Sequence, residues 1–183
     1  WMEPGIWERR SAHLRGRLRK LGFTEMSPAR VQGRDGRYWF SCLLDTRCHL
    51  FTWDPRTDAL KDHGSYDGPL IWQFQPLFQA PDSSIWYGTT LGGQHMVCRL
   101  NEADPLNSTC YRFDLPYRHH GIQFISSQHF SADGALWLGT CEGVFRLDPA
   151  TGEWLRFHHV DRDSSSLAAD MVFSLCPDPH RPE

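Results

Sequence analysis

The residues of this chain that could do chemistry are mainly histidines and the side chains of three loops. Ten histidines occur in 183 residues, and they include the adjacent pairs His119–His120 and His158–His159. Neighbouring strand side chains point to opposite faces, so neither pair is a natural bidentate metal site, and both pairs are interpreted as solvated loop residues. The sequence also has no phosphate-cradling glycine loop, nucleophile elbow or kinase signature. It therefore predicts no enzyme, no metal site and no cofactor in this chain.

Three polar loops are the candidates for ligand binding: residues 62–69, 116–121 and 160–166. They combine aromatic rings, charges and hydrogen-bonding groups, which is the mixture that a sugar or an acidic sugar requires. The candidate ligand-binding residues are Tyr66, Asp67, Tyr117, Arg118, His119 and Arg162. They can act together only if the elements between them bring the three loops to one mouth.

The elements between these loops are repeats of one unit. The segment DGALWLGT at residues 133–140 has a close copy, DSSIWYGT, at residues 82–89 and a more diverged copy, DGRYWFSC, at residues 35–42. Their tryptophans lie about 50 residues apart, and a period of this length with aromatic and glycine punctuation is typical of propeller blades. Each candidate loop then enters a new blade, so the loops are expected together at the mouth of a central channel.

Each repeat predicts four strands. After the tryptophan segment, GVFRLDPATGEW at residues 143–154 parallels HLFTWDPRTDAL at residues 49–60, and in both an alternating strand runs into an Asp-Pro turn. Proline fixes the φ angle of such a turn, and Gly152 or Asp58 tolerates its tight bend. A further strand follows the turn, and an apolar-polar strand precedes each tryptophan segment, as in MVFSL at residues 171–175.

We therefore predict an all-β fold, part of a β-propeller with four-stranded antiparallel blades. About three blades and a fragment form an incomplete ring, because propellers need roughly four to eight blades, so the remaining blades are expected elsewhere in the same protein. The predicted segments are a basic lead segment at 1–24 and a propeller fragment at 25–183, with blades at roughly 27–65, 70–115 and 121–160 and a partial blade at 167–183.

The repeated tryptophans are interpreted as packing between blades rather than as a platform for stacking sugars. Leu136 and Leu138 fall on one face of their strand, and Trp137 falls on the other. A tryptophan at each equivalent place fills the wedge between neighbouring blades, and burial of such a ring stabilises a fold by several kcal/mol.

The basic lead segment does not fit the repeat. Trp7, Leu14, Leu18 and Leu21 would line one face of a helix over residues 6–23, with basic residues on much of the rest. Two interpretations stay open: a basic helix for a membrane surface or nucleic acid, and a poorly ordered lead. For the whole chain, the near balance of 22 acidic and 19 basic residues argues neither for nucleic acid nor for an acidic membrane surface, and no nucleic-acid partner is predicted. No secretory signal and no apolar run of the roughly 20 residues needed to span a membrane is visible.

The six cysteines are too irregularly spaced for a zinc site. Cys98 and Cys110 fall on consecutive strands of one blade, where a disulfide is one alternative in an oxidising compartment. Buried thiols are the expected state, because free cysteine is among the most buried residue types.

The best-preserved repeat resembles a known family. Residues 133–178, with DGALWLGT, GVFRLD, TGEWLRF, a Ser-Leu loop and VFSL, are similar to the two-component regulator propeller repeat; residues 82–132 match moderately and residues 35–81 weakly. The resemblance implies the periplasmic sensor domain of a bacterial hybrid two-component histidine kinase, attached to the inner membrane by segments outside this chain. Many such sensors respond to breakdown products of complex carbohydrates, so the implied ligand is an oligosaccharide or another small molecule.

Other classes stay open beside the sensor. WD40 and Kelch repeats fit poorly, since the chain has a lone Trp53-Asp54 and a lone Gly-Gly. The Asp-box of sialidase-like glycosidases places its tryptophan one residue further from the Asp, and a one-residue slip turns a strand side chain to the opposite face. A carbohydrate-active enzyme would need a pair of carboxylates, whereas Asp67, Asp161 and Asp163 come from different blades. A propeller scaffold that binds another protein, and a homodimer, are further alternatives.

Overall fold

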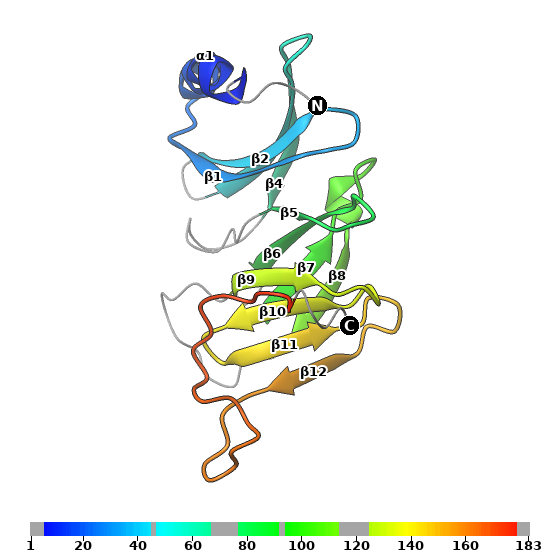
Figure 1. Ribbon diagram of the computed structural model, residues 1–183. Helices are drawn as coiled ribbons and strands as arrows, with labels where there is room; N and C mark the ends of the chain where they lie inside the picture. The colour runs from blue at the N-terminus through cyan, green and yellow to red at the C-terminus, as the bar shows by residue number, and fades with distance from the viewer. Residues whose placement is uncertain (1–5, 45–46, 67–76, 92–93, 114–124, 179–183) are drawn as a thin grey trace. The chain divides into compact units, whose positions relative to one another are not determined.

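The computed structural model describes residues 6–44, 47–66, 77–91, 94–113 and 125–178 (Figure 1). Within these residues the chain forms one α-helix and three four-stranded sheets, each made of strands that follow one another in sequence. We call them sheet A, with the order β1-β2-β3-β4, sheet B, with the order β5-β6-β7-β8, and sheet C, with the order β9-β10-β11-β12.

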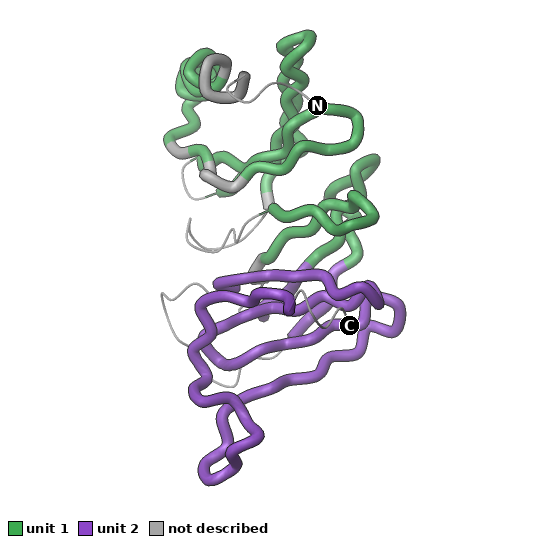
Figure 2. The backbone as a smooth tube through the Cα atoms, viewed as in Figure 1, with its two compact units in different colours: residues 1–92, 98–109 green, residues 93–97, 110–183 purple. Residues whose placement is uncertain are grey.

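The elements have the following bounds: α1 Ile6–Lys20, β1 Glu25–Gln32, β2 Tyr38–Leu44, β3 Arg47–Asp54, β4 Ala59–Tyr66, β5 Phe78–Gln79, β6 Ile85–Leu91, β7 Gln94–Arg99, the 3-10 helix η2 Pro105–Asn107, β8 Thr109–Phe113, β9 Ile125–Phe130, β10 Leu136–Thr140, β11 Gly143–Leu147 and β12 Trp154–Phe157. A meander of four antiparallel strands is the unit of a propeller blade. The chain divides into two compact units, residues 1–92 with 98–109 and residues 93–97 with 110–183 (Figure 2). Sheet A and α1 belong to the first unit, and sheet C belongs to the second.

The repeated Asp of each tryptophan segment closes the turn before the segment. Oδ1 of Asp35, Asp82 and Asp133 accepts a hydrogen bond from the backbone N–H two residues later, at 2.9, 2.8 and 3.1 Å. Such a bond from a short acidic side chain stabilises a turn locally. At Asp133, hydrogen bonds from Ser131, from the backbone and from Arg146 lower the pKa to about 2. These repeated acids are therefore architectural.

The Asp-Pro turns of sheets A and C are built alike. Oδ1 of Asp54 and of Asp148 accepts a hydrogen bond from the backbone N–H two residues later, at 2.9 and 2.8 Å. The bend itself has a positive φ angle, 57° at Asp58 and 77° at Gly152. Glycine and aspartate tolerate this region better than most residues, so the expectation for these two positions is confirmed.

The repeated tryptophans are packing residues. Trp39 and Trp86 are 1% and 2% exposed. Trp137 is half-buried and stacks on Phe157, with ring centres 5.6 Å apart and planes 20° apart. In the strand register Trp137 lies opposite Arg146 on one face of the sheet, and its neighbour Leu138 lies opposite Phe145 on the other face. The rings thus contribute to the core rather than forming an open platform.

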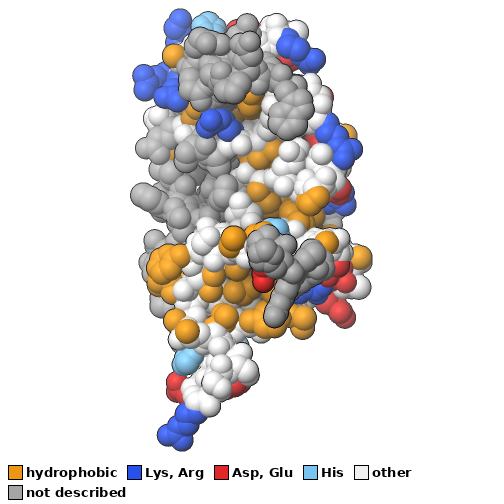
Figure 3. Space-filling model, in the orientation of Figure 1, with side chains coloured by type: hydrophobic (Ala, Val, Ile, Leu, Met, Phe, Trp, Pro, Cys, Tyr) orange, Lys and Arg blue, Asp and Glu red, His pale blue; other side chains and the backbone are white. Residues whose placement is uncertain are grey.

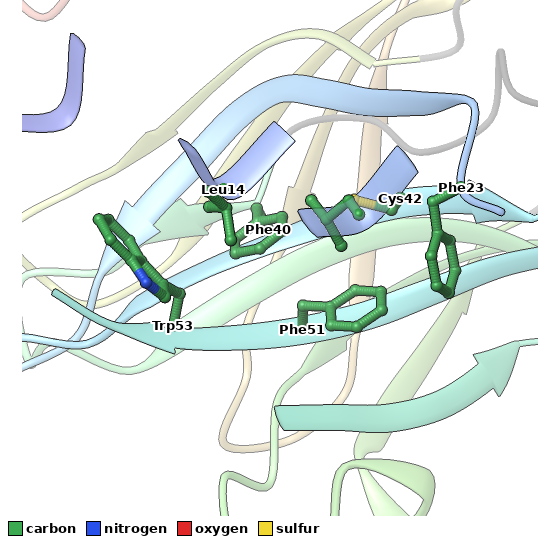
Figure 4. Packing of buried hydrophobic residues seen from close by; sticks show 7 residues of the cluster. Leu14, Phe23, Phe40, Cys42, Phe51 and Trp53 are labelled. Carbon is green, nitrogen blue, oxygen red and sulfur yellow. The ribbon is translucent and has the colours of Figure 1, made fainter. Parts of the chain in front are cut away.

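Helix α1 packs on sheet A, and together they enclose one apolar cluster (Figure 4). The buried members of the cluster are Leu14, Leu18, Phe23, Phe40, Cys42, Phe51 and Trp53. Of the apolar face expected for the lead segment, Leu14 and Leu18 are 0% and 3% exposed, whereas Leu21, just beyond the helix, is 60% exposed. Over residues 6–20, therefore, the lead segment is a helix whose apolar face is covered by the first sheet.

The strand expected at residues 171–175 is not formed, and among the described residues none is assigned after β12. The segment still follows sheet C, since the Val172 N–H donates to the Thr140 carbonyl at 2.9 Å and the Leu175 N–H donates to Ser127 Oγ of β9 at 2.8 Å. A strand requires a continuous ladder with a neighbour, and Met171 and Phe173 remain 48% and 76% exposed here.

Candidate functional site

Of the six predicted ligand-binding residues, Arg162 is the one whose side chain the structure describes. Tyr66 ends strand β4, where the structure describes the backbone and not the side chain. Outside the described residues lie Asp67, Tyr117, Arg118 and His119. Their grouping at one channel mouth therefore stays a prediction, and the site can be built upward from the loop that carries Arg162.

This loop, residues 158–170, begins where the outer strand β12 ends and is drawn from orange to red in Figure 1. Its far end is attached to the hairpin between β10 and β11, because the Gly143 N–H donates to the Asp170 carbonyl at 2.6 Å. Two residues later, the Val172 N–H donates to the carbonyl of Thr140 in the same hairpin. Both ends of the loop are therefore held by sheet C.

Gly143 brings this hairpin close to the start of the loop. Its φ angle is 106°, and a Cβ atom added there would lie 2.2 Å from the Phe157 carbonyl oxygen. No side chain fits at that distance, and the backbone conformation itself favours glycine. A glycine is therefore required for the approach of β12 to the hairpin.

Serine and aspartate side chains fold the loop on itself. Ser166 Oγ accepts a hydrogen bond from the Val160 N–H at 3.0 Å, and the Ser166 N–H donates to the Asp163 carbonyl at 3.1 Å. Asp163 Oδ1 accepts bonds from the Ser165 N–H at 2.9 Å and from its hydroxyl at 2.6 Å, which lower the pKa of Asp163. The loop therefore has its own internal structure and a carboxylate that stays charged at neutral pH.

His159 joins the two ends of the loop. Its Nδ1 lies 2.7 Å from the Leu167 carbonyl oxygen, its Nε2 lies 3.2 Å from Asp161 Oδ1, and its backbone N–H donates to Asp170 Oδ1 at 2.6 Å. Carbonyl and carboxylate oxygens only accept, so both ring contacts are hydrogen bonds only when both ring nitrogens carry a proton. The bond to Leu167, and then that to Asp161, raise the pKa of His159. His159 is thus an exposed loop residue, as predicted, and its ring also organises the loop, which was not predicted.

Glu142 is a buried acid beside the loop that was not predicted from the sequence. Its side chain is 5% exposed and pairs with Arg156 Nη2 at 3.2 Å, while Arg156 Nε donates to the Glu142 carbonyl at 3.0 Å. The guanidinium also lies 5.7 Å from the centre of the Phe145 ring. This pair ties the β10–β11 turn to β12, from which the loop departs.

Arg162 lies at the tip of the loop, exposed and with a φ angle of 68°. Beside it, the side chain of Asp161 is 98% exposed. The tip thus presents a cation, carboxylates and serine hydroxyls to solvent. Such groups can hydrogen-bond the hydroxyls of a sugar, and the guanidinium can pair with an acidic one.

In the part of the chain that the structure describes, no three His, Cys, Asp or Glu side chains lie close enough together to hold a metal ion. A glycosidase would require a pair of separated carboxylates. Of the three acids considered for this role, Asp67 lies outside the described residues, and Asp161 and Asp163 share one loop rather than coming from different blades.

Two cysteines differ from the expectation of buried thiols. Cys98, on β7, and Cys110, on β8, are disulfide-bonded. The free cysteines are Cys42, Cys48, Cys141 and Cys176. Burial raises the pKa of both Cys42 and Cys48 to about 12, so these two thiols are unreactive packing residues.

Among the described residues, α1 included, no helix combines the length and the apolar character needed to cross a bilayer.

No family model matches the sequence, and neither does any curated protein. Solved structures do match. PorZ, an essential surface component of the type-IX secretion system of Porphyromonas gingivalis, matches with a TM-score of 0.56 and 14% identity over 85% of this chain and 24% of its own. The extracellular domain of BT3049, assigned as a hybrid two-component system of B. thetaiotaomicron, matches with a TM-score of 0.52 and 15% identity over 79% of this chain and 17% of its own.

The chain therefore spans a quarter or less of the length of these neighbours. At such identities the likeness concerns the fold. The three four-stranded sheets and the two neighbours together confirm the predicted fold class, an incomplete β-propeller. The resemblance to the extracellular propellers of two-component sensors is confirmed at the level of the fold.

Proposed function

We propose that this chain is part of an extracytoplasmic propeller that senses a ligand for a two-component signalling system. The observation that carries the proposal is the fold shared with the extracellular domain of BT3049, in a chain whose residues 133–178 keep the repeat pattern of such sensors. The disulfide-bonded state of Cys98 and Cys110 supports a place outside the cytoplasm, since disulfides persist in oxidising compartments. The periplasm is the compartment we propose, and kinase activity would belong to the whole protein.

The ligand we propose is an oligosaccharide released from a complex carbohydrate. The loop at 158–170 supports this, because it presents charged and hydroxyl groups while its backbone is already held by His159 and Asp163. A loop that is ordered beforehand loses less conformational entropy on binding. The other proposed contacts are Tyr66, Asp67, Tyr117, Arg118 and His119, from the loops of neighbouring blades. The remaining blades of the same protein would complete the mouth.

The test is titration of the whole protein with a panel of neutral and acidic oligosaccharides, followed by calorimetry. We expect an acidic member to bind and Arg162→Ala to weaken it about tenfold or more, since a hydrogen bond to a charged group contributes roughly 1.5–3 kcal/mol. Arg19→Ala is the matched control, because Arg19 is an exposed arginine on α1, and it should leave binding unchanged. The carbohydrate assignment fails if no member binds, or if Arg162→Ala binds as tightly as Arg19→Ala.

A protein-binding scaffold is the second candidate, favoured by the fold shared with PorZ, a bacterial surface component. A scaffold would contact its partner through the rim of the sheets rather than through the loop tip. If none of the oligosaccharides binds, and Arg162→Ala folds like the wild type, this candidate is favoured over the sensor.

A further inference from the structure

All three sheets have the same turn before the tryptophan segment, at residues 33–37, 80–84 and 131–135. In each turn the backbone N–H of the first residue donates to the carbonyl of the fifth, at 2.9, 2.9 and 3.0 Å. The N–H of the fourth residue donates back to the carbonyl of the first, at 3.0, 2.8 and 2.9 Å. The third residue is the repeated Asp in every case. The three turns can therefore be compared position by position.

In sheet C a serine hydroxyl joins the repeated tryptophan to the repeated Asp. The Trp137 indole N–H donates to Ser131 Oγ at 3.0 Å, and the Ser131 hydroxyl donates to Asp133 Oδ1 at 2.5 Å. The same hydroxyl lies 3.2 Å from the Ala135 carbonyl oxygen. The second oxygen of the carboxylate, Oδ2, accepts from Arg146 at 2.6 Å. The hydroxyl thus has one donor and two acceptors around it.

In sheet B the same link is built from a different backbone position. The Trp86 indole N–H donates to Ser84 Oγ at 2.9 Å, and the Ser84 hydroxyl donates to Asp82 Oδ1 at 2.6 Å. Ser84 is the fifth residue of its turn, whereas the serine of sheet C is the first, and the first residue here is Ala80. Arg99 again pairs with Oδ2 of the Asp, at 2.9 Å. Two positions of the turn thus provide a hydroxyl to the same pair of groups.

In sheet A neither position carries a hydroxyl, since the turn begins with Gly33 and ends with Arg37. The rest of the arrangement is kept: Asp35 Oδ1 accepts the backbone N–H of Arg37, and Oδ2 accepts from its side chain at 2.6 Å. Trp39 is 1% exposed, and among the described residues no acceptor lies within hydrogen-bonding reach of its Nε1. A buried donor without an acceptor destabilises a fold, and such groups are rare in proteins.

The geometry at Gly33 shows where a partner for the indole would lie. A Cβ atom added to Gly33 would be 3.4 Å from Trp39 Nε1 and 3.2 Å from Asp35 Oδ1. It would be 3.7 Å from the Arg37 carbonyl oxygen. These are the counterparts of the indole, the carboxylate and the carbonyl that surround the serine hydroxyl of sheet C. Because Gly33 has no side chain, there is room between these groups for a small molecule.

We propose that one water molecule binds in sheet A between Gly33, the Trp39 indole and Asp35, and that it replaces the serine hydroxyl of the other two sheets. The surrounding groups decide the chemistry of the ligand. The indole N–H only donates, whereas the carboxylate and the carbonyl only accept. A metal cation cannot accept from the indole, and an anion cannot donate to the carboxylate. Water does both, and about three partners is the usual number for a buried water.

The proposed site lies just beneath a charged surface. Arg34, Asp35 and Arg37 are exposed, and Figure 3, in the orientation of Figure 1, shows basic side chains at the surface beside the β1–β2 turn. Gly33 and Trp39 are buried below them. A water at this depth is separated from solvent by the turn alone, so it can enter without unfolding of the sheet.

The direct test is a high-resolution crystal structure of the full chain and of its Gly33→Ser variant. The wild type should show a water within about 3.2 Å of both Trp39 Nε1 and Asp35 Oδ1. In the variant the serine hydroxyl should take the place of this water and contact the same two atoms. The proposal is overturned if the wild type shows no water there, or if the serine hydroxyl of the variant contacts neither atom.

A second test in solution compares Gly33→Ser with Gly33→Ala. Gly33 is not among the glycines with a positive φ angle, so both side chains suit the backbone and restrict the unfolded chain alike. The alanine methyl group would displace the water without replacing its hydrogen bonds. Urea unfolding followed by tryptophan fluorescence should therefore give Gly33→Ser a folding equilibrium constant at least about fivefold larger than that of Gly33→Ala. Equal constants, or a larger one for alanine, would refute the proposal.

Sheet B provides the matched control at the equivalent position. Ala80→Ser should not increase the folding equilibrium constant, because Ser84 already provides the hydroxyl in that turn. Ser84→Ala should lower the constant by about fivefold, and addition of Ala80→Ser should recover most of the loss. If Ala80→Ser alone stabilises the protein as much as the exchange of alanine for serine at Gly33, or if it fails to recover the loss, the equivalence on which the water site depends is refuted.

Discussion

Sheets A and C are two copies of one blade whose sequences have diverged unequally. Sheet C keeps the repeat pattern almost throughout, whereas in sheet A the segment after the tryptophan reads Phe40-Ser41-Cys42 in place of Leu138-Gly139-Thr140. Yet Phe40 pairs with Phe51 as Leu138 pairs with Phe145, and the turn acids make the same hydrogen bonds. The blade therefore depends on the alternation of apolar residues and on its turn acids, while the apolar residue types can vary.

The two sheets differ most at the hairpin that follows the tryptophan strand. In sheet C, Gly143 is the first residue of β11, and its lack of a side chain leaves room for the Phe157 carbonyl. The loop 158–170 folds beside this hairpin and is bonded to it. In sheet A the equivalent position is His49, whose Nδ1 lies 2.9 Å from Asp62 Oδ2. The parts that repeat are architectural, and the end of the blade where the copies diverge is where we place ligand binding.

The largest effect on stability is expected at the buried face that is equivalent in the two sheets. Phe51→Ala and Phe145→Ala should each lower the free energy of unfolding by about 3–5 kcal/mol, because each removes a buried ring and leaves a cavity. Urea unfolding followed by tryptophan fluorescence measures both. Phe173→Ala is the control, since that ring is 76% exposed and should contribute little. A large loss in one sheet and none in the other would show that the two faces are not equivalent.

A smaller effect should distinguish the two hairpins. Gly143→Ala should destabilise the protein by about 3 kcal/mol, since the new Cβ atom would lie 2.2 Å from the Phe157 carbonyl oxygen. Gly134→Ala is the matched control: its φ angle is also positive, at 84°, but no atom lies within 4 Å, so the cost should be about 1 kcal/mol. Equal costs, measured by the same unfolding experiment, would mean that the close approach of β12 is not required.

The smallest effect concerns the loop of sheet C and depends on pH. The pKa of His159 is raised above its ordinary 6.5 by its bonds to Leu167 and Asp161. The protonated ring therefore stabilises the loop fully below about pH 6.5, and this contribution is lost as the pH rises through the higher pKa of the folded state. Corrected hydrogen exchange of residues 160–170 should be slower at about pH 5 than at about pH 8.

Replacement of the histidine provides the check on this expectation. His159→Gln should remove the pH dependence of exchange, because glutamine does not titrate, whereas His158→Gln at the exposed neighbouring position should keep it. A direct titration of the His159 ring by NMR should give a pKa above 6.5. A pKa at or below that value would contradict the double hydrogen bond of the ring.

Much of the fold could be predicted because its signals are local. The positive φ angles at Asp58 and Gly152 followed from turn chemistry, and the opposite placement of Leu138 and Trp137 followed from strand alternation. The candidate site was predicted less well. Arg162 was predicted as a loop residue and is exposed in a loop, and its role in binding stays a prediction. The organising role of His159 was not predicted, because it depends on how the loop returns to sheet C.

Other features could not be predicted because they join residues on different strands or elements. The Glu142–Arg156 pair depends on how β12 passes the β10–β11 turn, which a sequence does not display. The strand expected at residues 171–175 failed for a related reason, since an apolar-polar pattern becomes a strand only beside a partner that forms the ladder with it.

The sequence by itself determined the repeat, the number and order of strands in each blade, and the residues of the turns, because strand alternation and backbone sterics act between near neighbours. The tertiary structure alone decided that α1 covers sheet A, that Asp58 holds it through Arg17, and that Cys98 and Cys110 are oxidised. These features depend on surfaces that exist only after the sheets have formed, and neither the repeat period nor the composition shows which element covers such a surface.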